Sequence, residues 1–394
     1  MRPVFCAALL VFFEGIVIWS VFPTMTYFLQ DLGGEAFWIG ILFALMSGPK
    51  IVMNPVFGRL SDRIGRRPVL IFIMLGAIGG SVAWALAPSV GWLAVSRGIA
   101  GIFAAQAALS QTVVADATRP ERRAAAMGVL GAAFGLSMIV GPLLGGWVGH
   151  AWGSYAAIGW ACAAVQTLSL LVLVVFMPET RVRPERARAQ PQMAGMRGVL
   201  REPNVVPLLA VTLLMTLAFA ELTSTFASLS KDQYQLKVSD TTRLFVLLGI
   251  VALVTQGGIL RLLLPRFAEK GTALLGLLLL AVGLGWLGIL PARGSVWWAL
   301  GLVAAGSALA MPTLTALLSR CVGADRQGSL QGMHQSVTAL GRAVGALAGG
   351  FVYAQISRSS PYFSAVGVAL VAIVMLWTVR TSGTASDRPE SLQK

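Results

Sequence analysis

The stretch Gly58-Arg59-Leu60-Ser61-Asp62-Arg63-Ile64-Gly65-Arg66-Arg67-Pro68 decides how the chain folds. It places five charged side chains in a short, glycine-punctuated turn between two apolar runs that are too long for a soluble core. Across the chain 56% of the residues are hydrophobic and 12% are charged, and apolar runs of roughly 20 residues recur throughout. The pattern predicts a polytopic membrane protein rather than a soluble enzyme, with this stretch as a cytoplasmic loop.

Twelve apolar runs are long enough to cross about 30 Å of hydrocarbon as helices. They lie near residues 4–29, 36–57, 69–88, 91–115, 124–149, 154–177, 204–230, 242–264, 271–291, 295–319, 327–355 and 360–379. These runs take up most of the 394 residues and leave no segment for a separate soluble domain. We therefore predict an all-α fold of twelve transmembrane helices.

The distribution of charge predicts the orientation of these helices. With an internal N-terminus, the cytoplasmic loops hold most of the 30 Lys and Arg residues. The opposite loops keep only Lys231, Lys237, Arg243, Arg293 and Arg358. This positive-inside bias predicts that both termini lie in the cytoplasm and that the protein sits in the cell's inner membrane. The formal charge of +14 then faces the anionic cytoplasmic leaflet of the bilayer rather than nucleic acid.

Several other classes of protein lack support in the sequence. Cys6, Cys162 and Cys321 lie far apart with no CxxC or Cys/His spacing, so we expect neither a metal site nor a disulfide framework. The chain has no GxxxxGK[ST] loop and no HExxH sequence, so we expect no cofactor, no ATP-driven step and no enzyme activity. The first apolar run contains Glu14 and lacks a small-residue cleavage site, which predicts a retained helix.

A polar, Pro- and Arg-rich segment splits the runs six and six. We predict a six-helix bundle over residues 1–177, a cytoplasmic linker over 178–203, a second six-helix bundle over 204–380 and a cytoplasmic tail over 381–394. A shift of 204 residues superimposes Gly141 on Gly345 and Gly145-Gly146 on Gly349-Gly350, and a shift of 203 places Arg67 over Lys270. A parallel repeat of this kind predicts two bundles around a central cavity, as in an alternating-access carrier.

Several motifs together resemble the major facilitator superfamily, in particular its drug/proton antiporter branch and the tetracycline efflux proteins. Besides the quoted loop, they are Ser96-Arg97-Gly98 with Gly101, the glycines from Gly131 to Gly146, Ala115-Asp116-Ala117-Thr118 and Met311-Pro312. The resemblance covers nearly the whole chain and implies the twelve-helix fold, efflux of a small-molecule substrate and a monomer. The chain departs from the tetracycline group at Ala83-Trp84, where that group carries an acid.

The quoted loop combines turn glycines, one acid and three bases that the resemblance singles out: Gly58, Gly65, Asp62, Arg63, Arg66 and Arg67. The glycines permit a tight turn, the acid can accept hydrogen bonds at a helix N-terminus, and the arginines can reach carboxylates or lipid phosphates. The resemblance implies a cytoplasmic gating loop that latches the bundles in the outward-facing state, with Asp62 facing the eleventh span and the arginines engaging acids such as Asp116. A basic loop that only sets topology is the alternative, and it explains neither Asp62 nor the glycines.

The fifth span carries small residues and a proline mostly on one face: Gly131, Gly135, Gly141, Pro142, Gly145 and Gly146. A neighbouring backbone can approach such a face closely, and the proline removes a helical donor and bends the span. The resemblance implies an antiporter motif that acts as hinge and seal between the bundles and favours export. Ordinary packing of small residues is the alternative.

Five ionisable side chains lie well inside the predicted spans: Glu14, Lys50, Arg97, Glu221 and Arg342. Each is costly there without a partner, water or a function. Glu14 and Glu221 are the only deep carboxylates, and burial favours the protonated form of a carboxyl group, so we predict that they carry protons, with Glu14 favoured. The resemblance implies that Arg97 modulates the protonation of a carboxylate. The alternative is a static pairing of Glu14 with one of the cations, which would carry no proton.

The remaining candidates are polar side chains of the predicted cavity. Lys50 and Arg342 could neutralise the acids or attract an anionic substrate. Side chains that could orient a ligand are Gln106, Gln111, Gln256, His334 and Gln335, and interhelical hydrogen bonds are their alternative role.

We predict a secondary transporter that exchanges protons for a small amphipathic, drug-like compound and exports that compound. Proton-coupled or facilitative uptake of a small anionic metabolite is a second hypothesis, motivated by the intramembrane cations. A transport-inactive sensor on the same scaffold is a third.

Overall fold

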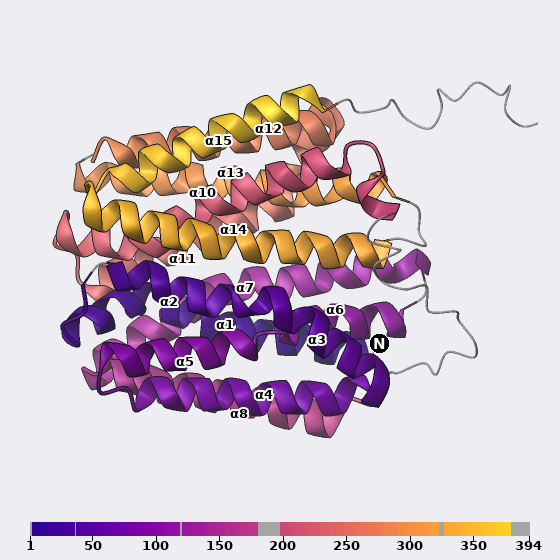
Figure 1. Ribbon diagram of the computed structural model, residues 1–394, viewed down its shortest axis with the longest axis horizontal. Helices are drawn as coiled ribbons and strands as arrows, with labels where there is room; N and C mark the ends of the chain where they lie inside the picture. Colours follow the sequence, from indigo (N-terminus) through magenta and orange to yellow (C-terminus); the bar gives the residue numbers. More distant parts are fainter. Residues whose placement is uncertain are drawn as a thin grey trace, which may run out of the picture.

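The computed structural model describes residues 2–35, 37–118, 120–179, 198–290, 292–322 and 327–379, and every regular element in these ranges is a helix. The helices lie side by side along one direction (Figure 1). The first half contains α1 (Arg2–Asp31), α2 (Phe37–Ser47), α3 (Pro49–Ile64), α4 (Arg66–Ala85), α5 (Val90–Ile102), α6 (Gln106–Ala117), α7 (Pro120–Trp152) and α8 (Tyr155–Phe176). The second half contains α10 (Val205–Asp232), α11 (Val238–Val254), the π-helix η1 (Thr255–Ile259), α12 (Leu260–Gly288), the 3-10 helix η2 (Arg293–Ser295), α13 (Val296–Arg320), α14 (Gln327–Gln355) and α15 (Ser360–Thr378). Most of the predicted linker, residues 180–197, the last residue of the predicted second bundle, 380, and the predicted tail, 381–394, lie outside the described residues.

Eleven described helical segments are apolar and long enough to cross a membrane, and one of them, Val238–Gly288, has 51 residues. A straight helix of that length would extend about 77 Å, more than twice the hydrocarbon thickness. The segment is interrupted at Ala268, whose backbone is non-helical (φ 51°, ψ −177°). Asp240 near its start contacts Arg293, whereas Glu269 just after the break contacts Arg320. The chain therefore crosses, turns at Ala268 and crosses back, which gives the twelve crossings that the hydropathy pattern predicts.

Two of the crossings consist of two shorter helices each. The second crossing breaks between α2 and α3, where Pro49 cannot donate a backbone hydrogen bond to the carbonyl of Leu45. The fourth crossing breaks at residues 103–105, between α5 and α6. The two breaks lie near each other, because a Cβ added to Gly101 would clash with the carbonyl oxygen of Leu45. Helix termini therefore lie in the middle of the membrane beside α1.

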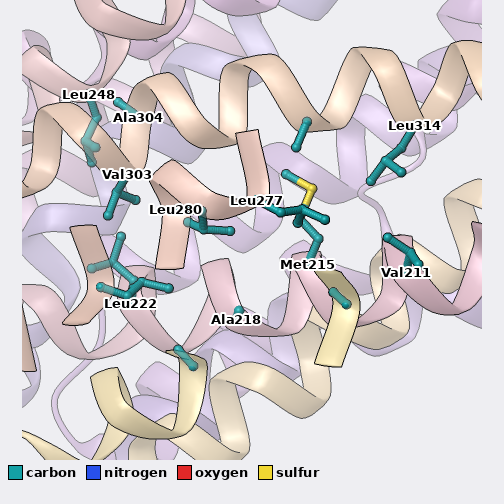
Figure 2. Packing of buried hydrophobic residues seen from close by; sticks show 14 of the residues in the cluster. Val211, Met215, Ala218, Leu222, Leu248, Leu277, Leu280, Val303, Ala304 and Leu314 are labelled. Carbon is teal, nitrogen blue, oxygen red and sulfur yellow. The ribbon is translucent and has the colours of Figure 1, made fainter. Parts of the chain in front are cut away.

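Each half has its own apolar core. Two clusters in the first half are built around residues such as Leu70 and Leu42, and a large cluster in the second half joins α10, α11, α12 and α13. Figure 2 shows part of this second-half cluster, with Met215 and Leu277 among its labelled side chains. The clusters mostly follow the two six-helix bundles, and they meet where Trp19 joins the second-half cluster and Ala346 joins a first-half cluster.

The two bundles meet along two equivalent seams. In the first, α7 packs on α11, and a Cβ added to Gly146 would lie 2.7 Å from Thr242. In the second, α14 packs on α2, and a Cβ added to Gly350 would lie 2.7 Å from the backbone of Gly40. Gly350 follows Gly146 by the 204 residues of the sequence repeat, so the seams are related by the same internal symmetry.

The seams close the bundles together at the end opposite the chain termini. The start of α1 and the end of α15 share one end of the bundle (Figure 1). At the other end, the Tyr27 hydroxyl donates to the Leu236 carbonyl at 3.0 Å and lies 2.7 Å from the Thr241 hydroxyl across the halves. Near the termini, added Cβ atoms at Gly131 and Gly332 would meet no described atom within 4 Å. These two glycines therefore make no close contact, unlike the seam glycines Gly146 and Gly350.

Candidate functional site

Glu14 lies on α1 where the two broken crossings meet. Its side chain is partly exposed although α1 is otherwise largely buried. The carboxylate interacts electrostatically with Lys50 of α3 and with the backbone N–H of Ala107 in α6. One acid thus faces one cation and one helix N-terminus.

The breaks in the helices place these partners. Lys50 is in the first turn of α3 and Ala107 in the first turn of α6, where backbone N–H groups have no partner inside the helix. The Gln106 amide fixes the start of α6 by donating to the Leu10 carbonyl at 2.6 Å, one turn before Glu14. The positive end of α6 and the ammonium group of Lys50 therefore converge on Glu14.

Arg342 reaches the same region from the other bundle. It interacts electrostatically with Lys50. One turn further along α14, the Ala346 carbonyl packs against Gly40 of α2, which puts this face of α14 against the second crossing. His334, two turns before Arg342, is buried, and its Nε2 lies 3.4 Å from the Thr315 hydroxyl. The site therefore has cations from both halves and one acid.

Aromatic rings lie one to two turns beyond Glu14 on α1. The centroid of the Trp19 ring lies 5.0 Å from that of Phe22 and 6.5 Å from that of Phe134 of α7, and the Phe22 and Phe43 centroids lie 4.7 Å apart. The Trp19 indole N–H is buried and has no partner among the described residues. These rings form an apolar cluster where α1 meets α7 and α2.

Arg97 points away from this region, toward α4 and α8. Its guanidinium lies 4.4 Å from the ring centroid of Trp84 and interacts with Cys162. The Trp84 indole N–H is held by the Tyr155 carbonyl at 3.0 Å. In the described part of the chain no carboxylate forms an ion pair with Arg97. The aromatic face of Trp84 is the partner of this buried cation.

Glu221 is also separated from Glu14. It is buried, and its carboxylate accepts a hydrogen bond from Ser364 of α15 at 3.2 Å. Its second carboxylate oxygen has no partner among the described groups. The two deep acids therefore lie on different sides of their bundles, Glu14 toward the seam and Glu221 toward α15.

The predicted glutamines do not form one cluster. Gln106 is buried and joins α6 to α1, as described above. Gln111 and Gln335 are half-buried on α6 and α14, and Gln256 is exposed in the π-helix η1. Only Gln106 is tied directly to the surroundings of Glu14.

The quoted loop is anchored within the first bundle. Arg66 contacts Asp62 at 2.6 Å and Asp116 of α6 at 2.9 Å. Glu179, just after the sixth crossing, accepts from the backbone N–H groups of Arg66 and Arg67 at 2.9 and 3.2 Å. Gly65 has φ 111°, and a Cβ there would lie 2.5 Å from this carboxylate, so the turn requires glycine.

The side chains of Asp62, Arg66 and Arg67 contact groups of their own bundle. Asp62 pairs with Arg66 of its own loop. Arg67 donates to the Val174 carbonyl at 2.6 Å, near the end of α8. Gly58 has open space around it, and Arg63 has interactions of its own.

The small residues of the fifth crossing, α7, serve two interfaces. Added Cβ atoms at Gly141 and Gly145 would lie 2.6 Å from Trp19 and 2.5 Å from Ser20, so they seat α7 on α1. Gly146 faces α11, and Gly135 has only the distant Leu253 side chain at 3.8 Å. Pro142 leaves the Met138 carbonyl without a helical donor, and Gly249 of α11 packs on that carbonyl, 2.8 Å from its would-be Cβ.

A family comparison agrees with this architecture. The sequence profile described as Major Facilitator Superfamily matches residues 7–346 and 266–394. The chain belongs to the major facilitator superfamily. It is an integral membrane transporter of a small-molecule substrate and not an enzyme.

Individual relatives place it more closely within the superfamily. The chain is 30% identical to the class C tetracycline resistance protein of Escherichia coli over 347 residues, covering 86% of this chain and 87% of that protein. It is 28% identical to the class E tetracycline resistance protein of the same organism, covering 95% and 94%. The structure of the human organic anion transporter MFSD10 (TETRAN) superimposes with a TM-score of 0.70 at 22% identity, covering 95% of this chain and 99% of that one.

This facilitator also has loop contacts in its second half that the motifs did not reveal. Glu269 pairs with Arg320 at the end of α13, and Lys270 donates to the Trp377 and Val379 carbonyls at 2.9 and 2.7 Å. The repeat shifts could have found them, because Arg66 plus 203 is Glu269 and Asp116 plus 204 is Arg320. The same ion pair occurs in both halves with its charges exchanged.

Proposed function

We propose that this facilitator exports a small amphipathic, drug-like compound in exchange for protons by alternating access. Its place is the cell's inner membrane, with both termini in the cytoplasm, as the positive-inside bias favours. The tetracycline resistance proteins among its relatives support export of such compounds. In the described arrangement the bundles are then open toward the cytoplasm, where an exporter collects its substrate.

The placement of Glu14 carries the proposal. A carboxylate held by Lys50 and by the start of α6 can exchange these partners for a proton or for a donor on the substrate. Glu14 lies beside the seam between the bundles. The group that its carboxylate binds, a proton or a donor on the substrate, can therefore change how well the two halves fit together. Binding can shift the balance of orientations only through such a difference between the two states.

The loop and glycine motifs supply the conformational half of this mechanism. In the outward-facing state the loop around Asp62 comes against the start of α14, and the seams at Gly146 and Gly350 separate. In the cytoplasm-open state the Arg66 contacts with Asp62 and Asp116 hold the loop within its own bundle. Gly141 and Gly145 keep α7 seated on α1 through the whole cycle.

The test uses purified full-length protein in liposomes. A diverse compound library is first screened for thermal stabilisation, and flux and luminal pH are then measured with the hits. We expect substrate and proton to move in opposite directions, and we expect Glu14→Gln to abolish proton movement while the matched variant Glu221→Gln retains it. Unchanged proton dependence in Glu14→Gln would contradict the assignment.

The excess of cations at the site favours a second candidate, uptake of a small anionic metabolite. Lys50 and Arg342 outnumber Glu14 there. In that case substrate and proton would enter the liposome together, or the substrate would move without protons. The sign of the luminal pH change therefore decides between the two candidates.

A further inference from the structure

We infer that the substrate is a zwitterion: its ammonium group pairs with Glu14, and its acidic group binds between Lys50 and Arg342. This inference rests on the proposed exchange of substrate for protons. It goes further by specifying the charges that the substrate must carry.

The first step is the inventory of charged groups around Glu14. Lys50 of α3 and the backbone amide of Ala107 in α6 interact with Glu14 itself, and Arg342 of α14 interacts with Lys50. The other intramembrane charges are turned elsewhere, Arg97 onto Trp84 and Glu221 onto Ser364. His334 lies beside Arg342 and is buried against Thr315. The groups that a ligand meets are thus one acid and two strong bases.

The second step concerns the positive group of the substrate. A proton and a substrate that are exchanged at one carboxylate must exclude each other, so the substrate must bind better when Glu14 is ionised. A cationic donor meets this condition. A purely anionic substrate does the reverse, because an anion binds better once the negative charge of Glu14 has been removed.

The third step concerns the negative group. Lys50 and Arg342 exceed Glu14 by one positive charge, and a purely cationic substrate would bring a third cation into a site inside the membrane. An acidic group on the same molecule removes this repulsion. It also replaces Glu14 as the partner of Lys50 when the substrate's ammonium group takes the carboxylate.

The geometry places the two cations on opposite sides of one seam. Gly40 of α2 lies against Ala346 and Gly350, and α3 also packs on α14. Because the two crossings run in opposite directions, Lys50, ten residues after Gly40, lies toward the Arg342 side of that contact. An acidic group between them would touch both bundles at once, which links substrate binding to the orientation of the halves.

The apolar part of the substrate would lie against the rings beyond Glu14. Trp19, Phe22 and Phe134 form one continuous aromatic wall, and the buried indole N–H of Trp19 lacks a described partner. An aromatic amino acid therefore represents the expected charge pattern and shape in a simple form.

The experiment measures binding to purified full-length protein at fixed pH without a proton gradient. The probes are naphthylalanine and a panel of other aromatic amino acids, each as the free zwitterion, the cationic methyl ester and the anionic N-acetyl derivative. We expect the best zwitterion to bind at least about tenfold more tightly than its ester and its N-acetyl form. We expect Arg342→Gln to remove the preference over the ester, Glu14→Gln to remove the preference over the N-acetyl form, and Arg342→Lys to retain most of the affinity.

Arg358→Gln is the matched control, because it removes an arginine of the second half at the distant loop near Gln233. Equal or tighter binding of an ester to the wild type, an unchanged ranking in a folded Arg342→Gln protein, or no binding by any zwitterion overturns the inference. The flux test separates this inference from the proposed function. If zwitterions bind best but no protons are exchanged, only the proposed function is contradicted. If a substrate with a positive charge alone drives proton exchange, only this inference is contradicted.

Discussion

The two seams between the bundles share a backbone plan but differ in their side chains. In the α7–α11 seam, Gly146 packs on Thr242, and Met138 packs on Gly249 through its carbonyl. In the α14–α2 seam, Gly350 packs on Gly40, and Arg342 stands where the repeat has Met138. Ten residues after Gly40 comes Lys50, whereas ten residues after Thr242 comes Ala252. One seam is apolar and the other carries cations.

The difference shows that the rocking of the bundles and the binding of charged groups have separate structural requirements. Rocking two bundles needs close backbone contact along both seams, and both have glycine there. Binding a charged group needs a site in only one place. The acids follow the same logic. Gly15 packs on Ser137 in the first bundle, and Thr216 packs on Gly341 at the equivalent place in the second. The residue before each of them is Glu14 in the first bundle and Met215, part of the apolar core of Figure 2, in the second. Glu14 therefore has no acidic counterpart in the second bundle.

The largest effect should come from filling the seams. Gly249→Leu and Gly350→Leu would each place side-chain atoms where even a Cβ lies within 2.8 Å of the opposite backbone. Overpacking of this kind costs about 2–3 kcal/mol, so we expect the closed seam to be disfavoured and transport to fall by roughly 30- to 150-fold. Flux in liposomes measures the loss, and labelling of a cysteine placed at Thr242 measures the opening.

Gly367→Leu is the control for these variants, because an added Cβ there meets no described atom within 4 Å. It should transport at the wild-type rate. If Gly249→Leu and Gly350→Leu did the same, the seams would not need to close for transport.

A smaller effect should follow from exchanging the residues that distinguish the seams. Arg342→Met makes the second seam resemble the first, and loss of one charged contact to substrate, about 1.5–3 kcal/mol, should weaken substrate binding roughly 10- to 150-fold. The double variant Arg342→Met with Met138→Arg has the wild-type net charge, but its arginine lies at the other seam. We therefore expect substrate binding to stay as weak as in Arg342→Met. Binding and flux of the single and double variants check this, and recovery in the double variant would show that only the net charge of the cavity matters.

The fold could be predicted from sequence because the membrane leaves few solutions for an apolar run. Backbone groups in hydrocarbon must be bonded internally, so each run of roughly 20 residues becomes a helix. Even the crossing hidden in Val238–Gly288 followed from its length and the charges near Ala268. The glycine spacing likewise indicated the repeat, because close backbone contacts tolerate no larger residue.

The site was less predictable, because hydropathy does not determine which way a helix is rotated. α10 carries Thr and Ser on several faces near Glu221, so nothing in its sequence told whether Glu221 faces the seam or Ser364. The break at Gly48-Pro49 had a sequence signal, whereas the break before Gln106 had none. Arg97 was expected near a carboxylate, and its stacking on Trp84 depends on a tertiary contact between α5 and α4.

A still smaller effect should distinguish the two loop ion pairs. The second half already uses the reversed order, Glu269 with Arg320, where the first half uses Arg66 with Asp116. Exposed pairs contribute about 0–1 kcal/mol, so Arg320→Glu should slow transport no more than about fivefold. Adding Glu269→Arg should restore the rate, whereas Arg66→Asp with Asp116→Arg should recover only in part, because residue 66 must also pair with Asp62. Equal recovery in both halves would mean that Asp62 contributes nothing to the loop.

The smallest expected effect compares the cations that bind the ends of the last crossing in each bundle. Lys270 donates to two carbonyls at the end of α15, and Arg67 donates to one near the end of α8. Each such bond is worth about 0.5–1.5 kcal/mol, so Lys270→Met should lower the melting temperature by a few degrees and Arg67→Met by about half as much. Arg261→Met, which removes an exposed cation from α12, is the control. Thermal unfolding in detergent checks the order of the melting temperatures. Because both cations lie outside the cavity, substrate affinity should stay unchanged in all three variants. A larger loss of melting temperature in Arg67→Met than in Lys270→Met would mean that the first bundle depends more on its loop than the second.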